Sequence, residues 1–253
     1  MKNKKLLLML TLSAGLLLSS CVSSKKIVYL QDKLPENSIE NISKYEIKIQ
    51  PGDLLYINIS AIDTKATLPF NLYESGVVTT GNLKPLLYLV NVDGEINFPV
   101  VGVLKVAGLT TKQISNMLTE KLTSYLKNPI VNIRLKNFKV TILGEVKNPG
   151  TYIVDNEKIS VLEAIGLAGD LNIQAKRSKI TLVREQQGKR TLATFDLTSE
   201  ALFNSPYFYL AQNDVIYVKP NKSKINSSAV GPNTSILISS VSTLISLIAI
   251  LTR

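Results

Sequence analysis

The side chains that most often carry catalysis are scarce in this chain of 253 residues, which has no histidine and one cysteine. This composition excludes histidine-based triads and the common zinc ligand sets. Paired carboxylates stay possible, because a glycosidase needs only two of them. The candidates by residue type are Asp53, Asp63, Asp93, Glu95, Asp155, Asp170 and Asp214.

Several of these carboxylates stand in turn sequences, which gives them a structural role instead. Asp53 follows Pro51-Gly52 and Asp93 precedes Gly94, and aspartate at such positions bonds to the nearby backbone. The sequence also has no glycine-rich phosphate loop. The residue types therefore favour binding, assembly or conduction, and we predict no enzyme activity, no metal site and no bound cofactor.

The single cysteine, Cys21, ends a sequence typical of a secretory signal. Lysines within the first five residues precede a leucine-rich run, and Leu18-Ser19-Ser20-Cys21 follows. This ending resembles the bacterial lipobox, whose cysteine carries diacylglycerol and an N-acyl chain and begins the mature protein. We therefore predict a signal peptide over residues 1–20 and lipidation of Cys21. An ordinary signal peptide with a coincidental cysteine is the alternative.

The residues after Cys21 predict the location of the mature chain. Val22, rather than aspartate, follows the cysteine, which fits the outer membrane by the enterobacterial sorting rule. The next residues lack an acidic run that would mark surface exposure, so we expect the folded part in the periplasm. Removing the signal peptide takes away three lysines and no acids, and the net charge falls from +10 to +7. Such a basic protein could meet anionic lipid or an anionic polymer, whereas nothing resembles a nucleic-acid-binding arm.

The C-terminal segment, residues 235–253, carries a second membrane signal. Seventeen residues, Ser235 to Leu251, are uncharged, and as a helix they would span about 26 Å, close to the hydrocarbon thickness of a bilayer. Serines recur on one helical face and are predicted to line a pore or a seam between helices; they are Ser235, Ser239, Ser242 and Ser246. The alternatives are a buried or frayed terminal helix, or a single anchor whose serines bond to its own carbonyls.

Between these ends, a polar tether over residues 21–44 leads into a first folded unit, residues 45–136. Alternating apolar residues predict a strand at 54–61, and Asp93-Gly94 predicts a hairpin between strands at 87–92 and 96–101. Thr110 and Gln113 have the spacing of a capping box, so a helix should begin there and end before Pro129. A strand at 130–135 completes a small α+β domain.

A second unit occupies residues 137–220 and reads as a β-grasp domain. Ser160 and Glu163 predict a capped helix over residues 161–168, and a hairpin should turn at Gln187-Gly188. The last predicted strand is at 215–218. A polar linker, residues 221–234, then leads to the C-terminal helix, so the predicted fold class is α+β with a C-terminal transmembrane helix.

The chain resembles the Wza-type family of polysaccharide export outer-membrane lipoproteins, through motifs in both units. In the first unit these are Tyr45, Ile47 and Ile49 before Pro51-Gly52-Asp53 and Leu55, then Asp93-Gly94 with Ile96, Pro99 and Gly102, then Gly108-Leu109-Thr110. The second unit resembles the family's soluble-ligand-binding β-grasp (SLBB) domain through Gly144-Glu145-Val146, Asn148-Pro149-Gly150-Thr151-Tyr152 and Ala168-Gly169-Asp170.

The resemblance implies a ring of identical subunits, an octamer in the family's pattern, lipid-anchored in the outer membrane. Its C-terminal helices would form an α-helical pore for capsular polysaccharide or exopolysaccharide. An inner-membrane polysaccharide copolymerase would deliver the polymer, and the export protein would do no chemistry. This chain has one β-grasp unit where the best-known members stack two, so its periplasmic body should be shorter.

Two other classes of protein remain open. One is a lipoprotein that forms no pore and whose β-grasp domain binds a soluble ligand or saccharide. The other is a carbohydrate-active enzyme with a carboxylate pair, which would lose polymer turnover when one acidic pair is changed to amides.

Overall fold

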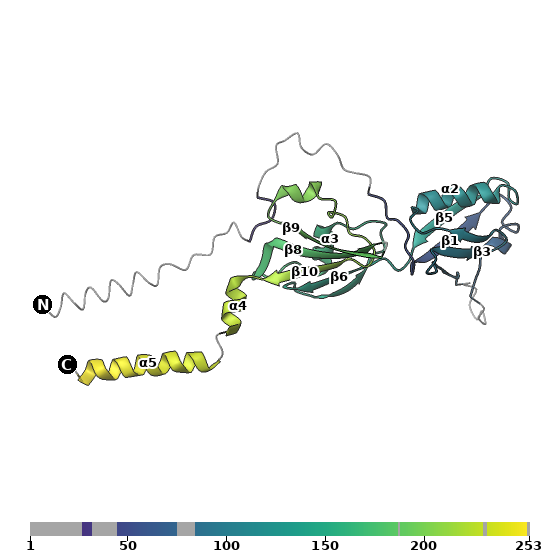
Figure 1. The fold of residues 1–253 in the computed structure, drawn as a ribbon. Helices are drawn as coiled ribbons and strands as arrows, with labels where there is room; N and C mark the ends of the chain where they lie inside the picture. The colour runs from purple at the N-terminus through teal and green to yellow at the C-terminus, as the bar shows by residue number, and fades with distance from the viewer. Residues whose placement is uncertain (1–26, 32–44, 75–83, 187, 230–231, 252–253) are drawn as a thin grey trace.

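The computed structural model describes residues 27–31, 45–74, 84–186, 188–229 and 232–251. Two folded domains follow one another along the molecule, and a C-terminal helix extends from the second one (Figure 1). Cys21 and the predicted signal peptide lie outside the described residues.

The first domain, here called the export domain after the resemblance of its motifs, builds its core between a three-stranded sheet and a helix. The sheet has the order β2-β1-β5, with β1 antiparallel to both neighbours. Strict alternation along β1 buries Leu55, Ile57 and Ile59 on one face. Helix α2 packs on β5 and begins at the predicted Thr110–Gln113 capping box. The elements are β1 (Leu54–Ser60), the 3-10 helix η2 (Leu68–Phe70), β2 (Tyr88–Leu89), α2 (Thr111–Leu122) and β5 (Ile130–Leu135).

The predicted hairpin around Asp93-Gly94 is wrong in its pairing. The turn itself forms, because Gly94 adopts φ +76 and its N–H donates to the Asn91 carbonyl at 2.9 Å. However, β2 pairs with β1, and β3 (Glu95–Phe98) pairs with β4 (Gly102–Lys105). Pro99 lacks an N–H for a ladder and follows β3 directly, so the chain reverses there instead.

The second domain, called the SLBB domain after the same resemblance, contains a five-stranded mixed sheet of order β7-β6-β10-β8-β9. The last strand enters the middle of the sheet, where β10 runs parallel to β6 and antiparallel to β8. Helix α3 covers the sheet and starts at the predicted Ser160–Glu163 capping box. The elements are β6 (Lys139–Gly144), β7 (Gly150–Ile153), α3 (Val161–Leu167), β8 (Ala175–Gln186), β9 (Lys189–Phe195), the 3-10 helix η3 (Glu200–Asn204) and β10 (Val215–Pro220).

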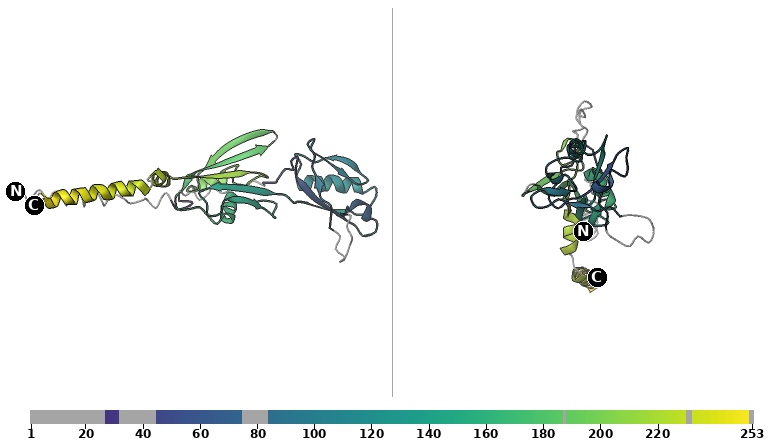
Figure 2. Two further views of the ribbon diagram at one scale, coloured as in Figure 1. Left: turned by 90° about the horizontal axis from the view of Figure 1, so that it is seen from below. Right: turned by 90° about the vertical axis from the view of Figure 1, so that its right-hand side faces the viewer.

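The segment after β10 is more regular than its polar composition suggests. Residues 221–234, predicted as a linker, contain helix α4 (Lys222–Ala229), and helix α5 (Pro232–Leu251) begins before Ser235. Helix α5 lies at the end of the molecule opposite the export domain in both side views (Figures 1 and 2).

A buried ion pair holds the turn from which β10 starts. The Arg184 guanidinium donates from Nε to Asp214 Oδ1 at 3.0 Å and from Nη2 to Oδ2 at 2.6 Å. Asp214 also accepts from the Ala211 N–H, and the Arg184 Nη2 donates to the Tyr209 carbonyl. The Asp214 side chain is fully buried, so this two-point pair joins β8 to the start of β10 in a water-poor site.

We expect Asp214→Asn to lower the free energy of unfolding by about 3 kcal/mol, because it leaves the Arg184 charge buried without its counter-ion. Thermal and urea denaturation of the full chain in detergent would measure this loss. Asp155→Asn is the matched control, since Asp155 is exposed. Equal stability of the two variants would contradict the role given to the pair.

Candidate functional site: helix α5, the chain ends and the domain junction

Helix α5 presents an uncharged apolar surface with no covering layer in the described single chain. Its large aliphatic side chains are more than half exposed; they are Ile236, Val241, Leu244, Ile245, Leu247, Ile248 and Ile250. A contiguous apolar surface of this kind usually marks contact with a partner or a membrane. Across the described residues, no helix has the length and apolar character needed to span a membrane. The structure therefore does not confirm the prediction that residues 235–253 span a membrane, although a helix forms there.

All four predicted serines lie within α5. Ser242 Oγ donates to the Ser239 carbonyl and Ser246 Oγ donates to the Ser242 carbonyl, each at 2.9 Å. Such bonds satisfy a hydroxyl on an apolar helix and match the alternative in which serines bond to their own helix. They do not prevent the same face from lying along a pore or seam, so the role of the stripe stays a prediction.

Residues 27–31, here called the strap, bind the SLBB domain. The Leu30 and Gln31 N–H groups donate to the carbonyls of Leu197 and Thr198 at 3.1 and 2.7 Å. Tyr29 OH donates to Asp170 Oδ1 at 2.5 Å, and the Arg177 guanidinium lies 5.5 Å from the Tyr29 ring centroid. The predicted tether is thus fixed to the domain shortly after Cys21.

The C-terminal exit lies close to this strap. Arg177, which faces Tyr29, belongs to the start of β8, and Ala175 two residues earlier pairs with Pro220 at the end of β10. Asn221 then donates its N–H to the Gln174 carbonyl at 2.7 Å. The strap and the C-terminal exit therefore lie at the same edge of the SLBB domain, where β8 starts and β10 ends.

The two domains are joined by amide side chains on both sides of their boundary. Asn137 accepts from the Leu54 N–H at 2.9 Å and donates to the Gly52 carbonyl at 3.0 Å. Gln212 donates to the Asn137 carbonyl at 2.7 Å and accepts from the Lys139 N–H at 2.8 Å. These bonds satisfy the backbone of the connecting segment with neutral groups.

Tyr45 makes a second crossing between the domains. Its hydroxyl donates to the Leu210 carbonyl at 3.2 Å, and its ring stacks on Tyr209 with centroids 5.4 Å apart. A few residues later, the Ile49 backbone forms hydrogen bonds with the backbone of Gly108 and Leu109 in the export domain. The chain thus bonds to both domains as it passes the junction.

Asp53 is buried at this junction, with 1% of its surface exposed. Its Oδ2 accepts from the Gln50 N–H at 2.9 Å. Burial raises the pKa of this carboxyl to about 6, against the lowering effects of hydrogen bonds from Gln50 and Gln212. Asp53 is therefore a turn-forming group, as its position after Pro51-Gly52 predicted.

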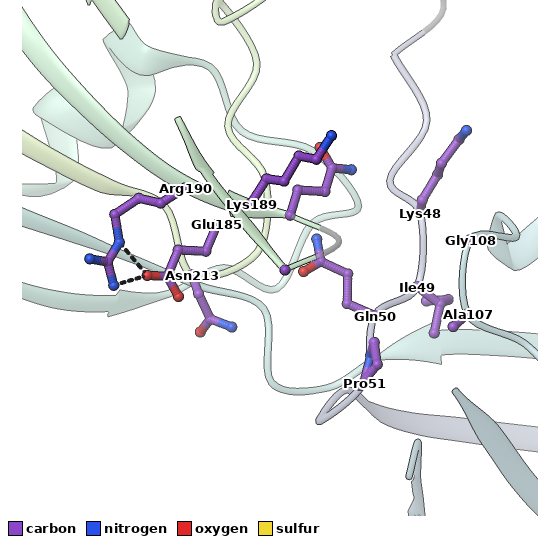
Figure 3. Close-up of a pocket in the computed structure, with 12 residues that line it drawn as sticks. Lys48, Ile49, Gln50, Pro51, Ala107, Gly108, Glu185, Lys189, Arg190 and Asn213 are labelled. Atoms are coloured by element: carbon purple, nitrogen blue, oxygen red, sulfur yellow. Dashed lines mark hydrogen bonds and ion pairs between the residues drawn. The ribbon is translucent and has the colours of Figure 1, made fainter. Parts of the chain in front are cut away.

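A cleft of about 670 Å³ opens beside the junction, between the β8–β9 hairpin and residues 48–51 (Figure 3). Its basic side chains are Lys48, Lys189 and Arg190, and its one acidic side chain is Glu185. Arg190 Nε donates to Glu185 Oε1 at 2.6 Å. The sequence analysis did not predict this cleft, because its walls come from positions about 140 residues apart.

Two further carboxylates bond to groups close to them in the fold. Asp63 accepts backbone hydrogen bonds from Lys65 and Ala66, and Asp170 accepts from Tyr29 and the Leu171 N–H. Within the described ranges, no three carboxylate, cysteine or histidine side chains gather as a possible metal site. The arrangement suits attachment and assembly.

A β-grasp domain behind a small α+β domain, with an exposed apolar helix, defines a two-domain assembly or binding protein. Residues 41–136 match the family described as Polysaccharide biosynthesis/export protein, and residues 139–195 match the SLBB domain. Both folded domains of the chain therefore match models of the export proteins that its motifs predicted. This is a family of export proteins, so the chain is not an enzyme.

Two relatives carry the name "EPS I polysaccharide export outer membrane protein EpsA". One is from Ralstonia solanacearum and the other from Ralstonia nicotianae, and each is 27% identical over 154 residues. The match covers 58% of this chain and 40% of each relative, so it spans well under half of the relatives' length.

We expect the stability of the wild-type protein to fall as pH rises from 4 to 7, relative to that of Asp53→Asn. The Asp53 carboxyl has a higher pKa in the folded chain, about 6, than its ordinary value of 3.8. Its stabilising contribution is therefore complete below pH 3.8 and lost as pH rises through 6. Between pH 4 and 7, the free energy of unfolding of the asparagine variant should therefore rise by about 2 kcal/mol relative to that of the wild type.

Urea denaturation at a series of pH values would measure this difference. Asp63→Asn, which changes an exposed carboxylate, is the control. A constant difference between wild type and Asp53→Asn across the range would show that Asp53 does not titrate within it.

Proposed function

We propose that this chain is a subunit of an outer-membrane exporter of polysaccharide, anchored by a lipid on Cys21. The observation that carries the proposal is that the strap and the C-terminal exit lie at one edge of the SLBB domain. The names of the two relatives support the same role and location.

The strap limits how far a lipid on Cys21 would lie from the SLBB domain. Five residues separate Cys21 from Ile27, the first described residue of the strap, so the two Cα atoms can lie at most about 20 Å apart. An acylated Cys21 would therefore hold this edge of the SLBB domain near the membrane. The chain leaves the same edge through α4 and leads to α5, so the export domain would point away into the periplasm.

The finer part of the proposal concerns α5. Its exposed, uncharged surface would be covered by α5 helices of neighbouring copies and by lipid. Such a ring, an octamer if it follows the family, would enclose a pore whose wall includes Ser239, Ser242 and Ser246. An inner-membrane copolymerase would supply the polymer from the periplasmic side.

The pore would act without covalent chemistry. A sugar polymer moves through a channel only if no single contact traps it, so a wall of hydroxyl and aliphatic groups is better suited than charges or aromatic rings. The alternative function is a lipoprotein that forms no pore and whose β-grasp domain binds a soluble ligand or saccharide.

The mass of the detergent-extracted protein distinguishes these two functions. We expect a ring of several copies, visible by electron microscopy, because the α5 surface has no cover within the described chain. Leu244→Arg should break the ring by placing a charge on that surface. Leu192→Arg, at an exposed apolar position on β9, is the matched control and should leave it intact. A monomeric wild-type protein would favour the alternative.

Cysteine substitution along α5 tests the hydroxyl stripe, since acylation would block Cys21 itself. We expect water-soluble thiol reagents to label Ser242→Cys and Ser246→Cys in membranes at least about tenfold faster than Ile245→Cys and Ile248→Cys, because only the serine face would meet water. Labelling confined to the isoleucine positions would overturn this assignment.

A further inference from the structure

We propose that the cleft between the β8–β9 hairpin and residues 48–51 binds a carboxylate-bearing saccharide, a segment of an acidic polymer. This inference rests on the proposed export function and adds the chemical class of the polymer. It also gives the two folded domains a contact site for the polymer, separate from the serines of α5.

One wall of the cleft is a fixed part of the export domain. Ile49 donates its N–H to the Leu109 carbonyl at 2.9 Å and accepts from the Gly108 N–H at 2.8 Å. Its neighbour Gln50 donates its own N–H to the buried Asp53 carboxylate. The backbone that carries Lys48 and Gln50 is therefore held on both sides, while their side chains stay at the cleft.

The opposite wall is the end of the β8–β9 hairpin, which extends beyond the rest of the sheet. Strand β10 begins at Val215, opposite Val183, so residues 184–186 of β8 pass its start. Their pairing continues only with β9, through Glu185↔Arg190 and Gln186↔Lys189. This leaves Lys189 and Arg190 beside the export domain, next to Asn213 in the turn before β10.

The charges of the lining favour an anion. Three of its side chains are basic and one is acidic, and the acidic one, Glu185, is occupied by Arg190. Neither Lys48 nor Lys189 has an ion pair among the described residues. Figure 3 shows both lysine side chains extending toward the same rim of the cleft, one from each wall. Two ammonium groups are thus available to carboxylates of one ligand.

The neutral groups of the lining suit a sugar better than an apolar ligand. Gln50, Gln186 and Asn213 supply amide donors and acceptors that match hydroxyl groups. Among the described residues of the lining there is no aromatic side chain on which a neutral sugar ring could stack. Recognition would therefore depend on charge and hydrogen bonds, which selects an acidic saccharide.

The binding should be weak and reversible. Lys48 and Lys189 are exposed, and ion pairs in water contribute little free energy each. A ring of copies would repeat the site, so a long polymer could be guided by several weak contacts without being held at one of them.

Titration calorimetry of the full chain in detergent, with a pentamer of galacturonic acid, tests the inference. The pentamer should bind, more weakly as salt is added, while a neutral maltopentaose should not. The double variant Lys48→Gln/Lys189→Gln should lose about tenfold in affinity. The control Lys112→Gln/Lys121→Gln removes the same charge from exposed positions of α2 and should bind as the wild type does.

Three results would overturn the inference: equal binding of the neutral pentamer, equal loss in both double variants, or tighter binding of pentaglutamate than of the acidic sugar. The last result would indicate an acidic peptide of a partner protein.

Restoration of polysaccharide export in cells lacking the gene tests the proposed function separately. If the wild-type gene restores export but the acidic pentamer does not bind, only the cleft assignment fails; if it binds but export is not restored, the proposed function fails.

Discussion

The Arg184–Asp214 ion pair holds the turn on which both the domain junction and the C-terminal exit of the chain depend. The pair fixes residues 211–214 against β8. Gln212 in this turn bonds the connecting segment between the domains, and Asn213 lies at the cleft. Strand β10 leaves the turn through the middle of the sheet and delivers the chain to α4 and α5. Because one buried contact sets this turn, the position of the export domain and the exit of the helix are coupled.

The features predicted correctly from the sequence were those with a local cause. Both capping boxes, Thr110–Gln113 and Ser160–Glu163, formed because their partners are three residues apart. The predicted pairing of the two strands around Asp93-Gly94 was wrong. The turn forms, but β2 pairs with β1 instead of with the strand that follows the turn. The motifs of the two domains predicted the family models that match them, because the order and spacing of motifs are properties of the sequence alone.

The strap, the amide junction and the cleft could not be predicted, because each joins residues far apart in the sequence. Tyr29 bonds to Asp170, and Lys48 and Lys189 line the same cleft, yet no periodicity links such pairs. The central place of β10 likewise depends on tertiary pairing rather than on strand propensity. For the serines, the sequence predicted that they lie within the C-terminal helix, and they do.

The double passage of the chain between the domains has a mechanical consequence. A single connection would leave the export domain free to rotate about it, and relative motion is the usual expectation for two domains with a modest interface. Here Tyr45 and Asn137 are separate points of attachment, each bonded across the boundary. A torque on the export domain would act on both points at once, so it would be transmitted to the SLBB domain instead of twisting one flexible connection.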